Sequence, residues 1–441
     1  MAINYSSTRG GEDNVTASMA ILKGLAADGG LFMPDYIPAL DCSLEELSHK
    51  TYQEVAYAVM KQFLTDFTEE ELKTCIERAY DSKFDTEEIA PLVKADGAYY
   101  LELFHGSTIA FKDMALQLLP HLLTLSAKKN GETREIFILV ATSGDTGKAA
   151  LEGFLDVPGT RCCVFYPREG VSQAQRLQMV TTGGANTHVI AVNGNFDDAQ
   201  TGVKRIFADR AFAETMDAQG RVLSSANSIN FGRLVPQVVY YFSAYADLLK
   251  AGAIKPGDEV NFCVPTGNFG DILAADYAGK AGLPVGRLIC ASNENNVLTD
   301  FINTGVYDVE NRPFYKTITP SMDILVSSNL ERLLFDDIPY LKEAQAEHDA
   351  FAQCLRDAGV EVVYLTDLVV ESLTGPEVRQ ALLTQFVDEA GVKEQGEREA
   401  VEAYLSELDD RTMVSAMMAG VRRSDLRRQD GRLSDHLSGL G

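Results

Sequence analysis

The sequence predicts an α/β protein built around a largely parallel sheet. From about residue 97 onward, short apolar runs alternate with helical stretches, which is the pattern of βαβ units. Six such runs are expected as strands: residues 99–104, 135–141, 162–166, 188–192, 259–264 and 287–291. Several end in turns rich in glycine, serine or threonine that lead into a helix. Because ligands of parallel sheets bind at the carboxyl ends of the strands, these turns are the expected place for a site.

Residues 1–85, before this alternation, are expected to form a helical and acidic N-terminal domain. Thr68 and Glu71 have the spacing of a capping box, in which each side chain bonds the backbone N–H of the other residue. The acidic residues 69–71 would also lie near the positive end of the helix dipole. A helix is therefore predicted to begin after Thr68.

Residues 86–333 form a second region, and the character of the chain changes after them. Residues 334–424 are mostly polar and predict a largely helical segment. The helices are expected at residues 340–357, 376–390 and 397–408, with one strand at residues 360–365. Residues 425–441, rich in arginine and serine, predict a disordered tail.

The bulk composition narrows the possible functions of this 441-residue chain. It contains no apolar run of about eighteen residues that could span a membrane. The N-terminus lacks the basic and apolar regions of a signal peptide, so a cytoplasmic location is expected. The formal charge of −25 argues against nucleic acid as a partner. Seven scattered cysteines and six histidines show no metal-ligand spacing, so free thiols and no metal site are expected.

Four motifs carry residues suited to chemistry, and the first surrounds Lys112. The run 103–113 places this lysine after a His-Gly turn, with Ala110 and Phe111 before it. An apolar pocket favours loss of the lysine proton, which must occur before the amine can form a Schiff base. The ordinary alternative is a surface lysine that opens a helix.

The other three motifs are suited to binding anions. Residues 140–150 end a strand in hydroxyl residues and glycines before a helix, and residues 264–272 do the same with glycines. Backbone amides at a helix N-terminus bind carboxylate or phosphate. Residues 225–234 bring two asparagines, a serine and Arg233 together, and this arginine could bind a phosphate monoester through two hydrogen bonds. Taken singly, these motifs are also consistent with a capped turn or a surface salt bridge.

Together and in this order, the four motifs resemble those of threonine synthase, a pyridoxal phosphate enzyme of the tryptophan synthase β-like fold (fold type II). The resemblance covers about residues 3–333, with further matches at residues 7–10, 28–32 and 320–324. It implies pyridoxal 5'-phosphate as the cofactor and Lys112 as the catalytic lysine that binds it. One departure is Ser107, where the family usually has proline, and a slightly looser turn is expected there.

The resemblance also implies roles for the other motif residues. Asp145 would lie near the ring hydroxyl of the cofactor. The residues expected to bind the cofactor are Lys112, Asp145, Thr266, Gly267, Asn268, Phe269, Gly270 and Asp271. The residues expected to bind the substrate carboxylate are Thr142, Ser143, Gly144 and Thr146. Those expected to bind the substrate phosphate are Asn227, Ser228 and Arg233.

The implied reaction converts O-phospho-L-homoserine and water to L-threonine and phosphate. Lys112 would remove the α-proton while the cofactor ring accepts the electrons. Arg233 and neighbouring amides would stabilise the departing phosphate. Such a local set of amides and cations would let a strongly acidic protein accept this small anionic substrate.

The resemblance to threonine synthase ends near residue 333, although that family normally continues further. The continuation brings a serine or threonine to the pyridine nitrogen and contains a Pro-x-Lys-Phe-like segment, and neither feature is found here. Residues 334–424 instead resemble arginine deiminase near its own N-terminus. The matching stretches are residues 334–338, 347–351, 360–365, 408–411 and 418–422. Because the deiminase nucleophile and histidine lie outside this part, deiminase activity is not expected.

Two other interpretations remain open. Without the missing strands, one edge of the large-domain sheet would be unpaired, so the chain could be a chimera that binds pyridoxal phosphate without turnover. A different lyase or dehydratase of the same fold is the other alternative. Residues 227–233 argue against it, because an enzyme whose substrate carries no phosphate has no need of that stretch.

Overall fold

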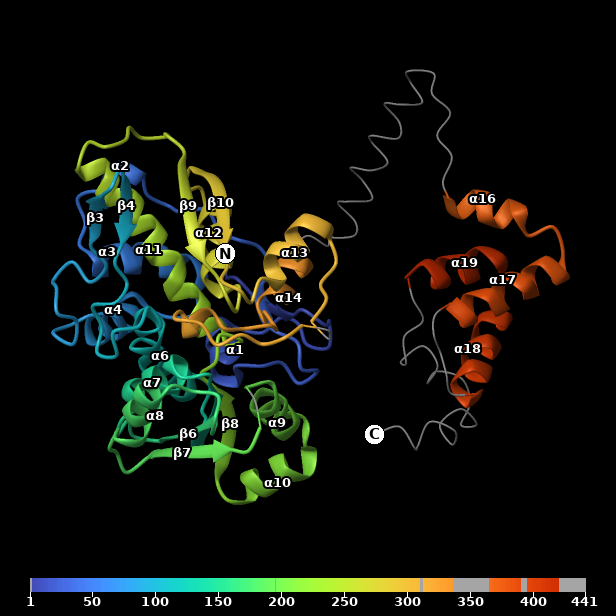
Figure 1. Ribbon diagram of the computed structural model, residues 1–441, viewed down its shortest axis with the longest axis horizontal. Coiled ribbons are helices and arrows are strands. Elements are labelled where there is room, and N and C mark those ends of the chain that lie inside the picture. The colour runs from blue at the N-terminus through green and yellow to red at the C-terminus, as the bar shows by residue number, and fades with distance from the viewer. Residues whose placement is uncertain (1, 195, 310–311, 337–364, 390–394, 420–441) are drawn as a thin grey trace. The chain divides into compact units, whose positions relative to one another are not determined.

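The computed structural model describes residues 2–194, 196–309, 312–336, 365–389 and 395–419 (Figure 1). The chain divides into two compact units, residues 1–338 and 339–441, and each has a hydrophobic core of its own. No described helix combines the length and the apolar character that crossing a membrane requires.

The first unit begins with two short antiparallel strands and four helices. The strands are β1 (Tyr5–Ser7) and β2 (Phe32–Pro34), and the helices are α1 (Ala17–Lys23), α2 (Leu44–Leu47), α3 (Tyr52–Phe63) and α4 (Glu69–Ala79). The capping box predicted for α4 is confirmed. The Thr68 hydroxyl accepts a hydrogen bond from the N–H of Glu71, and the Glu71 carboxylate accepts one from the N–H of Thr68.

A four-stranded parallel sheet follows, in the order β7-β6-β5-β8. Its strands are β5 (Glu135–Ala141), β6 (Thr160–Pro167), β7 (Thr187–Val192) and β8 (Arg221–Ser225). The sequence predicts three of them but misses β8. This short run contains an arginine and two serines, and its pairing with β5 makes it a strand.

Both faces of this sheet are covered, because alternate residues of β5 pack on opposite sides. Ile138 and Val140 belong to the main core of the unit, whereas Leu139 and Ala141 pack in a second cluster with Ala199. Figure 1 shows helices on both sides of the strands. These helices are α7 (Asp145–Gly153) and α8 (Gln173–Val180) on one side, and α9 (Phe196–Ala208) and α10 (Arg210–Ala218) on the other.

A second parallel sheet contains β9 (Val260–Pro265) and β10 (Val285–Ala291), which are connected through α12 (Gly270–Lys280). Only these two strands pair in it among the described residues. Ile289 of β10 is 49% exposed, so part of the apolar surface of this sheet is uncovered.

The strand predicted at residues 99–104 is shorter and differently paired. The structure has a separate antiparallel hairpin of β3 (Leu92–Ala95) and β4 (Ala98–Leu101). The two-residue turn explains the difference, since Asp96 and Gly97 have φ angles of 48° and 81°, which a tight hairpin turn requires.

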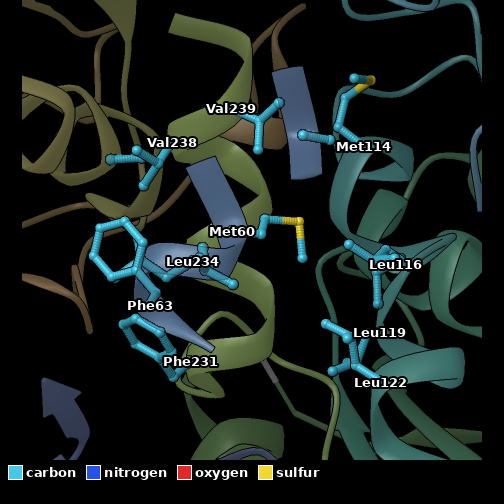
Figure 2. Close-up of a cluster of buried hydrophobic side chains, with 14 of the residues drawn as sticks. Met60, Phe63, Met114, Leu116, Leu119, Leu122, Phe231, Leu234, Val238 and Val239 are labelled. Atoms are coloured by element: carbon cyan, nitrogen blue, oxygen red, sulfur yellow. The ribbon is translucent and has the colours of Figure 1, made fainter. Parts of the chain in front are cut away.

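Helix α11 (Phe231–Lys250) forms the centre of the first unit and is buried along most of its length. It packs against α3, α5 (Asp113–Leu116), α6 (Leu119–Lys129) and α12. Figure 2 shows side chains of this core from α3, α5, α6 and α11: Met60, Phe63, Met114, Leu116, Leu119, Leu122, Phe231, Leu234, Val238 and Val239. The packing fixes the starts of α5 and α11, where the predicted site residues Lys112 and Arg233 lie.

The first unit ends with α13 (Val297–Thr304), the 3₁₀ turn η1 (Pro320–Met322) and α14 (Leu330–Asp336). The second unit contains α16 (Leu365–Ser372), α17 (Pro376–Glu389), α18 (Gln395–Glu407) and α19 (Asp410–Ala419). Its core consists of Leu383, Val387, Leu405, Met413 and Val414.

In this second unit, the helices predicted at residues 376–390 and 397–408 are confirmed by α17 and α18. The predicted helix 340–357 and the tail 425–441 lie outside the described residues, as do residues 360–364 of the predicted strand. Leu365, the last residue of that predicted strand, is instead the first residue of α16.

Candidate active site

A tight loop before α5 supports Lys112. The carboxylate of Asp113 accepts hydrogen bonds from the N–H and the hydroxyl of Thr108, at 2.7 and 2.8 Å, and so closes the loop. Gly106 is required where it stands, because an added Cβ would lie 2.5 Å from the Cβ of Asp113. Ile109 has a φ of 60°, which is costly for a β-branched residue. The backbone that carries the lysine is therefore held by several constraints.

The amine of Lys112 is buried, and its Nζ atom lies 3.9 Å from Oδ2 of Asp145. Burial lowers the pKa of this lysine to about 8, although the Asp145 carboxylate opposes the shift. Nζ also lies 5.0 Å from the centre of the Phe111 ring. A large share of the amine is consequently neutral at mildly alkaline pH, and the neutral form attacks carbonyl carbon and accepts protons.

Asp145 begins α7, just after the carboxyl end of β5. Its carboxylate accepts hydrogen bonds from Nε2 of Gln175, at 2.9 Å, and from the hydroxyl of Ser321. Burial would raise the pKa of Asp145, but the Lys112 ammonium and these two hydrogen bonds together hold that pKa below its usual value. Asp145 is therefore an ionised, fixed partner of Lys112.

The turn between β5 and Asp145 is built on Thr142, which is buried. Its hydroxyl accepts hydrogen bonds from the N–H groups of Gly144 and Gly147, at 2.9 and 2.8 Å. Gly144 gives helix α7 no side-chain cap, and because Gly147 already donates to Thr142, the first-turn amides left for an anion are those of Asp145 and Thr146. Gly144 has a φ of 143°, and a Cβ there would lie 2.3 Å from Nε2 of Gln175.

A second helix N-terminus lies at the 266–271 loop, which connects β9 to α12. Phe269 has a φ of 64°, and α12 also begins without a side-chain cap. A Cβ added at Gly267 would lie 3.0 Å from Cδ1 of Ile324, so the backbone approaches its neighbours closely here. Asp271 is half-buried, and its removal from water raises its pKa to about 6.

The third loop, residues 225–233, connects β8 to α11. The Asn227 side chain bonds both the N–H and the C=O of Ala141, at 3.2 and 2.8 Å, and so joins this loop to the end of β5. The Asn230 side chain caps α11 by accepting a hydrogen bond from the N–H of Gly232, at 2.9 Å. Both asparagines therefore hold the loop, and neither is free in the described structure to bind a ligand with its whole amide.

Arg233, in the first turn of α11, is 3% exposed. One of its Nη atoms donates to the carbonyl of Ala226 at 3.0 Å, but its buried Nε atom has no hydrogen-bond partner among the described residues. Burial lowers the pKa of the guanidinium to about 10. A buried cation with an unused donor is the strongest sign in this loop of an anion site.

Residues from all four motifs line one small cavity of about 30 Å³. The predicted residues in its wall are Lys112, Thr146, Asn227, Ser228, Arg233, Gly267, Asn268, Gly270 and Asp271. Thr142, Ser143, Gly144, Asp145, Thr266 and Phe269 do not line it. Of these, Thr142 and Thr266 are buried and shape the loops, and Asp145 contacts Lys112.

The wall also contains residues to which the sequence gives no role, among them Gln237, Ser321, Met322 and Ile324. The segment 320–324 forms part of the cavity wall, and the Ser321 hydroxyl also bonds Asp145. A volume of about 30 Å³ is on the scale of one water molecule, so a larger ligand requires some of the lining residues to move.

A larger cavity, of about 1170 Å³, lies elsewhere in the first unit, beside α1, α9, β8 and α14. None of the predicted site residues lines it. Size alone therefore does not identify the site, and the smaller cavity is the one that brings together a buried lysine, a buried arginine and the carboxylate of Asp271.

Two family models match the chain. The threonine synthase N terminus model matches residues 4–80, and the arginine deiminase model matches residues 331–437. The resemblances stated from the sequence are thereby confirmed, with a deiminase match somewhat longer than residues 334–424.

Sequence comparison with individual proteins also identifies threonine synthases as relatives of this chain. The chain is 44% identical to threonine synthase of Pseudomonas aeruginosa over 339 residues, which cover 76% of this chain and 69% of that protein. It is 46% identical to human threonine synthase-like 1 over 328 residues, which cover 72% of this chain but 44% of that protein. The chain thus spans less than half the length of the threonine synthase-like 1 proteins that it matches.

Solved structures have the same fold. The threonine synthase of Brucella melitensis, a structure with bound pyridoxal phosphate, superimposes with a TM-score of 0.68 at 38% identity, covering 82% of this chain and 75% of that one. The yeast threonine synthase gives a TM-score of 0.67 at 36% identity, covering 82% and 73%. The α/β fold is therefore that of the fold type II pyridoxal phosphate enzymes. Because the identity is 44% over 69% of the Pseudomonas protein, the chain belongs to the threonine synthase family.

Proposed function

We propose that this protein binds pyridoxal 5'-phosphate through Lys112 and converts O-phospho-L-homoserine and water to L-threonine and phosphate. The observation that carries the proposal is the buried Lys112 amine, 3.9 Å from the Asp145 carboxylate, in a cavity that Arg233 and the 266–271 loop also line. A lysine with a pKa of about 8 is suited to forming a Schiff base near neutral pH.

The residues of this cavity fit a phosphorylated cofactor and a second anion. Two uncapped helix N-termini, those of α7 and α12, supply backbone amides. The 266–271 loop would hold the cofactor phosphate, and the start of α7 would hold the substrate carboxylate. Arg233, with its unused Nε donor, would bind the substrate phosphate.

Separate side chains of this protein would then have separate roles in the reaction. When bound, pyridoxal phosphate supplies an electron sink for charge that develops at the substrate α-carbon. The neutral Nζ of Lys112 would accept the α-proton, and Asp145 would favour the resulting ammonium. Arg233 would neutralise charge on the leaving phosphate. Closure of the segment 320–324 over the cavity would exclude water.

A second candidate is cofactor binding without turnover. This protein matches 75% of the Brucella threonine synthase, so about a quarter of that chain has no counterpart in the match. The resemblance places the residue that faces the pyridine nitrogen in that part. A site without this residue would control the electron sink less well.

One experiment distinguishes the two candidates. The purified protein is incubated with pyridoxal phosphate and reduced with borohydride, and phosphate release from O-phospho-L-homoserine is assayed in parallel. Trapping of the cofactor with phosphate and threonine release supports the synthase. Trapping without product supports the second candidate, and the absence of trapping contradicts both.

A further inference from the structure

Arg332 of α14 is a fully buried guanidinium that lies behind the 225–233 loop. It is 0% exposed and does not line the small cavity, whereas Ser228 and Arg233 do. Its Nη2 donates to the carbonyl of Ile229 at 2.7 Å, and its Nη1 donates to that of Ser228 at 3.3 Å. A third bond, from Nε to the carbonyl of Phe32 at 2.9 Å, anchors the side chain to β2.

Burying a guanidinium is costly for a residue that only packs a helix. Removing a guanidinium from water costs several kcal/mol unless hydrogen bonds replace the lost hydration. The hydrogen-bond acceptors of Arg332 in the described part of the chain are all neutral carbonyl groups, and burial lowers its pKa to about 10. An apolar side chain would fill the same space without this cost, so the directed hydrogen bonds to the loop indicate a positioning role.

The contacts also suit an anion site. A phosphate oxygen is repelled by carbonyl oxygens and attracted by N–H groups. Because the peptide bond is trans, fixing the carbonyl of Ser228 toward Arg332 turns the N–H of Ile229 the other way, whereas the N–H of Asn230 already donates to the carbonyl of Asn227. Arg332 thus keeps two carbonyl oxygens of the loop that carries Arg233 bonded to its own guanidinium.

Asn329, one turn earlier in the chain, extends this network to the other phosphate loop. It is 0% exposed, and its backbone N–H and side-chain Nδ2 donate to the carbonyl of Asn268 at 3.1 and 3.2 Å. Its side-chain oxygen accepts a hydrogen bond from Nη1 of Arg332. Ser327 adds a bond from its hydroxyl to the carbonyl of Gly267. A single short segment therefore bonds two loops that start from different sheets.

We propose that Arg332, acting with Asn329, is a positioning residue that fixes the 225–233 loop relative to the 266–271 loop and so sets the spacing between the substrate phosphate and the cofactor phosphate. The proposal rests on the function proposed above. It means that specificity for a phosphorylated substrate depends on a residue that touches neither ligand.

The test compares Arg332→Met, Arg332→Lys and the control Glu331→Gln. Glu331 is on the same helix, but its carboxylate pairs with the exposed Arg9 and not with either loop. Cofactor trapping at Lys112 and binding of inorganic phosphate to the cofactor-loaded protein are measured by mass spectrometry and calorimetry. We expect Arg332→Met to weaken phosphate binding about tenfold or more, equivalent to ~1.4 kcal/mol, while cofactor trapping stays within about twofold. Arg332→Lys should recover part of the affinity, and Glu331→Gln should bind like the wild type.

A double-mutant cycle separates positioning from general destabilisation. If Arg332 acts through the loop that carries Arg233, its substitution should have little further effect on phosphate binding in an Arg233→Met background. The inference would be overturned if Arg332→Met lowered cofactor trapping as many-fold as phosphate binding and also lowered the thermal stability. If that variant does not fold, Arg332→Lys carries the test alone, with a partial loss of phosphate binding and unchanged cofactor trapping as the expected result.

The inference and the proposed function fail in different ways. A wild-type protein that traps no pyridoxal phosphate contradicts the proposed function. A wild-type protein and Arg332→Met that both trap the cofactor and bind phosphate equally well contradict the inference alone.

Discussion

The Nζ atom of Lys112 lies 3.9 Å from Oδ2 of Asp145, and both groups are largely buried. Burial lowers the pKa of the lysine, while the nearby carboxylate raises it, so the proton affinity of the amine depends on two opposing effects. The chemistry proposed for the site depends on this balance, because only a neutral amine can capture the cofactor.

The first prediction concerns the pH dependence of that capture. The folded pKa of Lys112, about 8, lies below the model-compound value of 10.5, so the neutral fraction rises as pH increases through about 8. The initial rate of pyridoxal phosphate capture should rise over the same range. In Asp145→Asn the midpoint should move to lower pH, because the carboxylate that favours the ammonium is lost. Rates measured by absorbance at a series of pH values test this, and a midpoint near 10.5 in the wild type would be inconsistent with it.

The second prediction concerns Asp271, whose folded pKa is raised by burial from 3.8 to about 6. The folded state therefore binds the extra proton more tightly than the unfolded state, and stability falls as pH rises through this window. Asp271→Asn removes the half-buried charge and should raise the free energy of unfolding by about 1–3 kcal/mol at neutral pH. The difference should shrink below pH 3.8, where both states of the wild type are protonated. Urea unfolding at neutral and acidic pH measures it, and a variant less stable at neutral pH would refute the argument.

The third prediction uses two glycines with different surroundings. Gly144→Ala introduces a Cβ 2.3 Å from Nε2 of Gln175, at a φ of 143°, and so displaces the side chain that bonds Asp145. Gly252 also has a positive φ, of 64°, but an added Cβ there meets nothing within 4 Å. Gly252→Ala should therefore show only the backbone cost of about 1–2 kcal/mol. Gly144→Ala should cost more in urea unfolding and should also slow cofactor capture, whereas equal effects on capture would rule out the proposed role of Gln175.

The fourth prediction concerns the second unit. Leu383 is 0% exposed in its core, so Leu383→Ala should lower the unfolding free energy of that unit by about 2–5 kcal/mol. Val378 lies on the same helix and is 43% exposed, so Val378→Ala should change stability by no more than about 0.5 kcal/mol. Because the two units have separate cores, neither substitution should alter cofactor capture. Calorimetry with a capture assay checks this, and loss of capture in Leu383→Ala alone would show that the units depend on each other.

Much of the framework can be predicted from the sequence, because it depends on local patterns. The strand β5 (Glu135–Ala141) has the predicted bounds, since seven mostly apolar residues precede a glycine-rich turn. The capping box at Thr68 and Glu71 is likewise local. Strand β8 (Arg221–Ser225) has no such pattern, and only its pairing with β5 makes it a strand.

The missed residues of the site depend on tertiary structure. Arg332 follows a glutamate and precedes two leucines, a pattern typical of an exposed arginine on an amphipathic helix, yet it is fully buried. Two of its acceptors, the carbonyls of Ser228 and Ile229, lie about a hundred residues earlier, and no sequence spacing indicates them. Ser321 lies in a stretch that resembles the family, but its contact with Asp145 appears only when the segment 320–324 folds over the cavity.

The identity of the reactive lysine is the claim on which the proposed function depends most directly. The decisive measurement is the peptide mass spectrum of the wild type and of Lys112→Ala after incubation with pyridoxal phosphate and borohydride reduction. We expect a pyridoxyl adduct on the peptide that contains Lys112, and no adduct in a folded Lys112→Ala protein. An adduct of equal yield in the variant, or one on a different lysine of the wild type, would contradict the proposed site.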